Sequence, residues 1–488
     1  MTASFLRHFF APFCVQPLVA ALLLFVAPAF AADKPNILMI VVDDLRPQLG
    51  CYGQSQVQSP NIDRLAAQGV LFERAYCMVP TCGASRASLM TSIRPAPKRF
   101  VSHLTYAERD APGITTLNTH LKQNGYTTLS NGKVFHHPED EAIGWSEPAW
   151  RPTVRKGPLT PEAKAEKKKP GGNKDEDGNT RSAPYEISPR PDDELGDGMV
   201  AQKTIADLQR LKGKEQPFFL VAGFFKPHLP FVAPKKYWDL YPAGTFKLPA
   251  NYYPPKDAPA AAIVDDGELR SYAGVPKAGP LSDELAINLI HGYNACVSFT
   301  DAQVGRVLAE LDRLDLAKDT IVILWGDHGW LLGEHSFWGK HRCYEDSMQV
   351  PLIIRAPGLK GGVKTTGITE LIDVYPSLCE LTGLPIPAHV QGRSFAPLLK
   401  NPMLPWKDQA IGRFQSGDTI RTDTHRFTEY SKAKGNPSGR MLYDHRDDPA
   451  ENVNVSEQPT SAATALKLAG RLNAGKGKDG DLPQPAAR

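Results

Sequence analysis

The stretch NILMIVVDD, residues 36–44, decides the fold class of this chain. Six of its first seven residues are apolar, and it ends in two carboxylates, Asp43 and Asp44. A near-continuous apolar run of this length is typical of a central strand in a parallel sheet, because helices cover both faces of such a sheet. The two aspartates then stand where the strand ends, which is a position suited to chemistry.

Three other β-like stretches also run into polar residues. Each predicts a strand whose last residues are followed by groups that bind cations or anions. They are TIVILWGDHGW (320–330), which reaches Asp327 and His328; PFFLVAGFFKPHLPF (217–231), which reaches Lys226 and His228; and GYTTLSNGKVFHH (125–137), which reaches Lys133 and His136.

Helical patterns separate these strands. SPNIDRLAAQG, residues 59–69, begins with Ser59 as N-cap and ends at a glycine, and residues 284–314 form a long amphipathic stretch. Alternating strands and helices predict an α/β fold with a parallel sheet covered on both faces. In such folds the site lies outside the carboxyl ends of the strands, so we expect the four strand ends to face one crevice.

The N-terminus has the pattern of an export signal. Residues 1–31 contain Arg7, the short apolar run LVAALLLFV and the small residues AFA at 29–31. The run is too short for a permanent membrane span, so we expect a periplasmic or secreted protein that starts near Ala32. A lipoprotein anchored at Cys14 fits less well, because the apolar run follows that cysteine.

The remaining chain is predicted to form two parts. Residues 32–385 form the catalytic domain, with a polar surface insertion at 151–196 whose lysine run favours a solvated loop over a contact with an anionic polymer. Residues 386–488 contain short β-like pieces, which predict a smaller antiparallel subdomain followed by a disordered tail. The formal charge of +3 gives no support to nucleic-acid binding. The six cysteines beyond Cys14 show no CxxC spacing, and their pairing is not readable from the sequence.

Carboxylates that converge at strand ends repel one another unless a cation neutralises them. The oxygen-rich set favours Ca²⁺ or Mg²⁺, while a histidine leaves Zn²⁺ or Mn²⁺ open. Lys133, His136, His228 and Lys340 suggest an anion site with proton donors. His137 is an alternative to His136 on spacing alone, and His335 and His341 are further candidates.

The stretch VPTCGASRASLMTS, residues 79–92, places Cys82 at the start of a helix, four residues before Arg86 and therefore on the same face. A helix start favours an anion. From these residues alone, Cys82 is either an inert buried thiol, a thiol nucleophile with a nearby base, or the centre of another kind of active site.

CGASR resembles the signature Cys-x-Pro/Ala-x-Arg of the formylglycine-dependent (type I) sulfatases. The resemblance extends in order over residues 36–455 and points to the iduronate-2-sulfatase branch. The matching stretches are NILMIVVDDLRPQLGCYG, SPNIDRLAAQGVLFERAY, NGKVFHH, FFKPHLPF, GDHGWLLGEHSFWGK and IRTDTHRFTEY…LYDHRDDPAEN.

The resemblance implies an alkaline-phosphatase-like α/β sandwich with a central, mostly parallel sheet and a smaller C-terminal antiparallel sheet. It implies that Cys82 is oxidised to formylglycine (3-oxoalanine), whose hydrated gem-diol attacks sulfur and forms a covalent sulfate intermediate. It also implies one bound Ca²⁺, held by Asp43, Asp44, Asp327, His328 and the modified Cys82.

The family roles carry over to further residues. Arg86 steadies the formylglycine, Lys133 and Lys340 hold sulfate oxygens, His228 and Lys340 stand where the alcohol leaves, and His136 helps to break down the intermediate. The implied partners are a sulfated carbohydrate substrate and a formylglycine-generating maturation enzyme. Position 84 is Ala where the commonest signature has Pro, which leaves the identity of that enzyme open.

The branch implies a 2-O-sulfated uronic acid, or a related sulfated sugar, as the substrate. Arg421 and His425 are the residues expected to reach a substrate carboxylate, with a structural salt bridge as the alternative. Two other functions remain open: a phosphate or phosphonate ester hydrolase of the same fold, and an unmatured, inactive glycan-binding protein.

Overall fold

The central sheet has eight strands and is built around β1 (Asn36–Val42), which pairs in parallel with a strand on either side. The strand order is β11-β2-β10-β7-β1-β5-β3, with β12 also paired to β2, and β10 runs antiparallel to both of its neighbours. The other strands are β2 (Val70–Tyr76), β3 (Thr127–Gly132), β5 (Phe218–Phe224), β7 (Thr320–Gly326), β10 (Gln349–Arg355), β11 (Val363–Thr365) and β12 (Thr369–Glu370).

This computed structural model describes residues 1, 34–153, 160, 181–263, 266–432 and 438–482. The predicted signal peptide, the lysine run of the predicted insertion and the last residues of the predicted tail lie outside the described residues. Residues 35–488 make up one compact unit.

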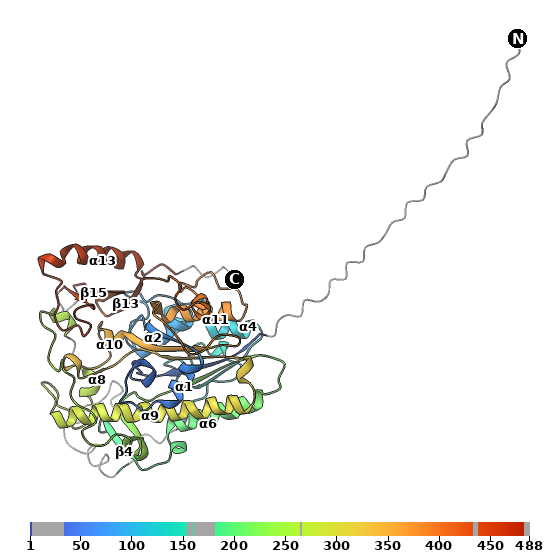
Figure 1. Ribbon diagram of the computed structural model, residues 1–488, viewed down its shortest axis with the longest axis horizontal. Helices are drawn as coiled ribbons and strands as arrows, with labels where there is room; N and C mark the ends of the chain where they lie inside the picture. Colours follow the sequence, from blue (N-terminus) through green and yellow to red (C-terminus); the bar gives the residue numbers. More distant parts are fainter. Residues whose placement is uncertain (2–33, 154–159, 161–180, 264–265, 433–437, 483–488) are drawn as a thin grey trace. The chain divides into compact units, whose positions relative to one another are not determined.

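Both faces of the sheet are covered, which explains why β1 is apolar without alternation (Figure 1). Leu38, Ile40 and Val42 join the core on one face, and Ile37, Met39 and Val41 join the core on the other. The first face is covered by α1 (Pro60–Gln68), α6 (Gly196–Leu211) and α9 (Asp283–Arg313), and the second by α2 (Cys82–Thr91), α4 (Leu117–Gln123) and α11 (Val374–Leu381).

Short elements fill the connections between these layers. The described part of the predicted insertion contains β4, which pairs with β6, so this part is attached to the fold. The short elements are α3 (Ala107–Asp110), α7 (Lys235–Trp238), α8 (Gly267–Arg270), α10 (Glu345–Met348), α12 (Ala396–Lys400), β4 (Tyr185–Ser188), β6 (Phe231–Pro234), β8 (Leu331–Leu332) and β9 (Trp338–Gly339).

The predicted C-terminal antiparallel sheet is confirmed. It is a meander of β13 (Gln409–Phe414), β14 (Gly417–Thr422), β15 (His425–Tyr430) and β16 (Gly439–Asp444). One face of it packs against α13 (Ala462–Gly475), a helix that the sequence analysis did not predict (Figure 1). Ile420 and Phe427 meet Leu468 and Leu472 there, at the helical spacing that buries one stripe of α13.

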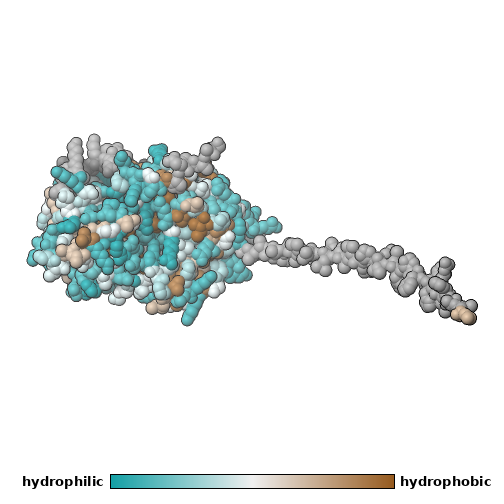
Figure 2. Space-filling model, turned by 90° about the horizontal axis from the view of Figure 1, so that it is seen from above, coloured by the Kyte–Doolittle hydropathy of each residue, from teal (hydrophilic) through white to brown (hydrophobic). Residues whose placement is uncertain are grey.

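The face seen in Figure 2 is largely hydrophilic, with hydrophobic residues scattered over it. Within the described ranges, no helix combines the length and apolar character that a membrane crossing requires. The six described cysteines are all free thiols.

Candidate active site

The carboxyl ends of four neighbouring parallel strands meet at one edge of the sheet. Asp43 and Asp44 follow β1, and the strands on either side of β1 lead into Asp327 and toward His228. Lys133 follows β3, the neighbour of β5. The convergence predicted from the sequence is therefore present.

Arg86 connects these strand ends. Its Nη2 donates to Asp43 Oδ1 at 2.9 Å, and its Nε donates to Asp327 Oδ2 at 2.9 Å. Its Nη1 donates to the carbonyls of Lys133 and Val134. All of the guanidinium is buried, so its charge is neutralised by the two aspartates rather than by water.

Cys82 is the first residue of α2, as predicted, and is 2% exposed. Its Sγ lies 3.2 Å from His328 Nε2, 3.5 Å from Lys340 Nζ and 3.9 Å from Asp44 Oδ1. The next residue, Gly83, lies so close to another loop that an added Cβ would be 2.1 Å from the carbonyl oxygen of His103. Only glycine permits this approach, which sets the start of α2 against the strand ends.

The donor set at Cys82 fits a cation. One ligand atom each from Asp43, Asp44, Cys82 and His328 lies within 4.8 Å of the others, which is the spread allowed by ligands 2.3–2.6 Å from one ion. His328 Nδ1 lies 2.9 Å from the Gly329 carbonyl and must donate to it, so a neutral ring leaves a lone pair on Nε2. That lone pair faces Asp44 Oδ1 at 3.2 Å, so two acceptors lie opposite each other. A cation between them would bind both.

Asp327 lies beside this group of four. Its Oδ1 is 3.6 Å from His328 Nε2 and accepts from the backbone N–H groups of Asp44 and His328 at 3.0 Å. Asp44 itself adopts a left-handed backbone with φ of 59°, which is uncommon for a residue other than glycine.

The charges at the site shift its protonation equilibria. Burial raises the pKa of Asp43, but Lys133 and Arg86 outweigh burial and hold that pKa well below its ordinary value. Burial raises the pKa of Asp327. Burial, assisted by the charge of Asp43, raises the pKa of the Cys82 thiol well above its ordinary value. A protonated thiol is a poor nucleophile, which counts against an ordinary cysteine mechanism.

Both lysines predicted for the anion site are buried in the cluster. Lys133 Nζ donates to Asp43, and Lys340 Nζ donates to Asp44 Oδ1 at 2.9 Å. Lys340 also pairs with Glu268 Oε2 at 3.3 Å, and Glu268 Oε1 lies 3.2 Å from His228 Nε2. Glu268 was missed by the sequence analysis because α8 follows no strand of the central sheet, and no local motif marks it.

The two adjacent histidines have different surroundings. His136 Nδ1 is buried and has no hydrogen-bond partner in the described part of the chain. Burial, assisted by the charge of Lys133, lowers the pKa of His136 to about 2. The ring of His137 stacks on Tyr106 instead, with centroids 3.9 Å apart. His341 stacks on Phe414, and His335 packs against Tyr344.

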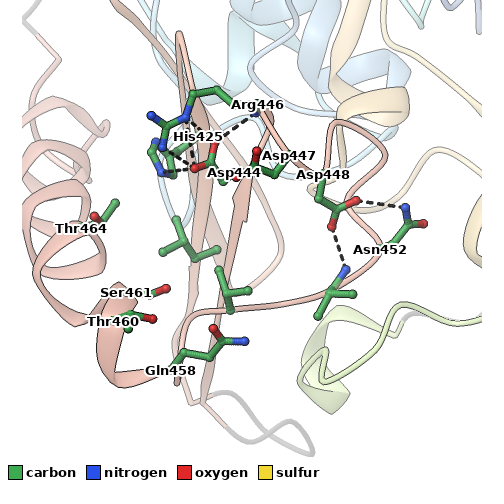
Figure 3. A pocket seen from close by; sticks show the side chains of 13 residues that line it. His425, Asp444, Arg446, Asp447, Asp448, Asn452, Gln458, Thr460, Ser461 and Thr464 are labelled. Atoms are coloured by element: carbon green, nitrogen blue, oxygen red, sulfur yellow. Dashed lines mark hydrogen bonds and ion pairs between the residues drawn. The ribbon is translucent and has the colours of Figure 1, made fainter.

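Arg421 and His425 are not part of the Cys82 cluster. Arg421 Nε pairs with Glu345 Oε2 at 3.0 Å, and Arg421 is 7% exposed. Of the two roles expected for Arg421, the structure therefore shows the salt bridge. His425 lines a separate pocket of about 580 Å³ beside the C-terminal sheet (Figure 3). There it lies 3.5 Å from Asp444, which also holds Arg446.

Comparison with known proteins places these features in context. Residues 35–384 match the family model described as Sulfatase, and residues 333–478 match one described as N-sulphoglucosamine sulphohydrolase, C-terminal. The iduronate 2-sulfatase of Mus musculus is 34% identical over 402 residues, which cover 75% of this chain and 72% of that protein. A sulfatase of Formosa agariphila is 32% identical over 441 residues, covering 86% and 83% of the two chains.

The solved structure of the phosphonate monoester hydrolase of Agrobacterium radiobacter shares the fold. The TM-score is 0.74 at 22% sequence identity, and the match covers 90% of this chain and 95% of that one. The expected alkaline-phosphatase-like architecture is thereby confirmed.

Proposed function

This chain belongs to the sulfatase family and is a sulfuric ester hydrolase, and from that premise we propose that it removes sulfate from uronic-acid-containing glycans. The observation that supports the site assignment is the position of Cys82. It begins α2, and its sulfur touches Lys340 and His328 where the strands that carry Asp44 and Asp327 end.

Formylglycine at position 82 is the form of the enzyme that we propose is active. A hydrated aldehyde there would supply one hydroxyl to attack sulfur and a second whose deprotonation would expel sulfate. Serine could attack but has no second hydroxyl. The high pKa of the unmodified thiol supports this proposal, because a buried, protonated Cys82 would attack poorly.

We propose Ca²⁺ as the ion at the cluster, held by Asp43, Asp44, Asp327, His328 and the modified side chain of residue 82. The donor set supports a hard cation, since the four residues with metal-like spacing include two carboxylates and Asp327 adds a third. A bound divalent ion would polarise the sulfate and offset its charge.

The other residues of the site have separate roles in the proposed reaction. Lys133 and Lys340 neutralise sulfate oxygens, and Arg86 holds the carboxylates in place. His228 gives a proton to the departing alcohol, and its side chain is 24% exposed, which is consistent with a position facing the substrate. His136 takes a proton from residue 82, a role supported by its buried Nδ1, which has no hydrogen-bond partner in the described part of the chain.

The substrate that we propose is a 2-O-sulfated uronate, on the basis of the named mouse relative. Defined oligosaccharides sulfated at single positions, with and without the uronate carboxylate, test it. Preference for a neutral sulfated sugar over every uronate would overturn this substrate and leave the sulfatase assignment intact.

The alternative ester chemistry is tested by parallel kinetics on 4-nitrophenyl sulfate and 4-nitrophenyl phosphate. We expect kcat/KM to favour the sulfate; a preference for the phosphate would contradict the proposal. An inactive glycan-binding protein would keep an intact thiol at position 82 in natively made protein and would bind glycans without turnover.

Export through residues 1–31 and maturation by a formylglycine-generating enzyme complete the proposal. N-terminal sequencing of the protein from its native host should find a start near Ala32. Co-expression with different maturation systems would show which one accepts a signature with Ala84.

A further inference from the structure

Glu268 forms contacts with both groups that we place at the leaving alcohol. Its Oε1 lies 3.2 Å from His228 Nε2, and its Oε2 lies 3.3 Å from Lys340 Nζ. A single carboxylate therefore bridges the histidine and the lysine. Arg181 approaches the same carboxylate at 3.7 Å.

The hydrogen bonds of His228 specify where its protons are. Its Nδ1 lies 2.6 Å from the carbonyl oxygen of Leu229 and must donate a proton to it. Its Nε2 faces a carboxylate oxygen of Glu268, which also accepts. The ring can donate to both acceptors only when each nitrogen carries a proton, and that is the form that acts as a general acid.

We propose that Glu268 is a positioning residue that fixes the His228 ring and favours its doubly protonated form, whose Nε2 proton passes from the hydrogen bond with Glu268 to the leaving oxygen. This inference rests on the proposed function. As the S–O bond breaks, the bridging oxygen keeps the bond electrons and takes the Nε2 proton. The alcohol and the imidazole are then both neutral, and the ring regains a proton from water before the next turnover.

The segment that carries Glu268 is fastened to the segment that carries Lys340. Asp266 Oδ1 accepts from the backbone N–H of Trp338 at 2.9 Å and from Arg342 Nη2 at 2.7 Å. The hydrogen bonds of Asp266, two residues earlier, thus hold Glu268 in place. This supports a fixed position of the carboxylate over a chance contact.

The charges around His228 give Glu268 a definite effect. Burial, assisted by Lys340, holds the pKa of His228 below its ordinary value, and the charges of Asp44, Glu268 and Asp43 oppose this only in part. Removing the Glu268 charge removes one of the carboxylates that oppose burial. The pKa of His228 would then be lower still in the variant, and a smaller fraction of its rings would carry the second proton.

The test compares two leaving groups of similar shape and different acidity, 4-nitrophenyl sulfate and phenyl sulfate. We expect Glu268→Gln to lower kcat/KM for phenyl sulfate by about 100-fold, the scale of general acid catalysis, and for 4-nitrophenyl sulfate by less than about threefold. Glu268→Asp should restore part of the loss. Glu457→Gln, which removes an exposed carboxylate of the C-terminal region, is the matched control and should change neither rate.

The double variant of Glu268→Gln with His228→Ala separates positioning from a merely structural role. We expect it to be no slower on phenyl sulfate than His228→Ala alone, since both changes remove the same proton. Multiplied losses, or equal slowing of the two esters by Glu268→Gln, would overturn the inference alone. Matured wild-type enzyme that hydrolyses neither these esters nor sulfated uronates would overturn the proposed function as well.

Discussion

Cys82 Sγ lies 3.2 Å from Nε2 of His328, so the first residue of α2 touches the second residue beyond the end of β7. The two are 246 positions apart in the chain. A helix start and a strand end thereby form one site, and the predictions below test what this site does.

Replacing Cys82 by alanine should lower turnover by about 1,000-fold or more, because the nucleophile is lost while the small side chain still fits. Thermal unfolding and circular dichroism should remain close to those of the wild type. Peptide mass analysis of protein made with a competent maturation system should find an aldehyde at position 82. Sustained wild-type turnover by Cys82→Ala would contradict the mechanism.

Removing divalent metal should abolish activity, and Ca²⁺ should restore it better than Zn²⁺. Added Ca²⁺ should also raise the Tm, because a ligand that binds only the folded state stabilises it. Asp43→Asn or Asp327→Asn should weaken this calcium-dependent shift, since each removes a negative charge from the cluster.

The control for the calcium shift is a change in the second group with metal-like spacing, Glu345, His445 and Glu451. Arg426 already neutralises both glutamates there. His445→Ala should therefore leave the shift in Tm unchanged. Full activity after exhaustive chelation, with no metal found by elemental analysis, would refute the calcium assignment.

His228→Ala should slow esters of poorly acidic alcohols, such as sugars, about 100-fold more than 4-nitrophenyl sulfate. Sugar alkoxides need a proton as they leave, whereas nitrophenolate hardly does. The ratio of the two kcat/KM values measures this. Equal slowing of both substrates would mean that His228 positions the sulfate instead.

His136→Ala should leave sulfate attached to residue 82, seen as a mass gain on that peptide after quenching. The wild-type ring has a pKa of about 2 and is neutral above that pH, so its titration should not appear in the pH profile of kcat between pH 5 and 8. Tyr106 holds the neighbouring His137, and His137→Ala is the control expected to release sulfate normally. Free turnover by His136→Ala would show that another base acts.

Arg421→Ala should destabilise the protein by about 3 kcal/mol, because it removes a buried ion-pair partner and leaves the partly buried Glu345 with fewer contacts. The preference among sulfated oligosaccharides should not change. Arg440→Ala, at an exposed ion pair, should cost less than about 1 kcal/mol. A change in sugar preference with unchanged stability would restore Arg421 as a substrate contact.

Local pattern was sufficient for the strands and for the groups that follow them. β1 is apolar on both faces because both faces are buried, and the lack of polar–apolar alternation in its sequence indicates this. Cys82 was found because its signature is a local string of five residues. The same logic could not reach Glu268, whose importance comes from contact between α8 and the distant segment around Lys340.

Arg421 illustrates the opposite failure. A strand arginine near the chain's end looked available for a carboxylate, but its partner, Glu345, is 76 residues earlier in the chain. Pairing across such a distance leaves no trace in the strand's own sequence. α13 was missed for a similar reason, since its apolar stripe is short and lies in a polar tail.

The burial of Cys82 makes maturation a matter of timing. In the folded chain Cys82 is buried and Gly83 lies against the His103 carbonyl. An enzyme that oxidises Cys82 would therefore need to bind the CGASR segment before α2 packs. Under the proposed maturation, the aldehyde would have to be installed before this segment folds, in competition with folding. A chain that folds first would keep the thiol, so the fraction of aldehyde at position 82 in a preparation would measure which process was faster.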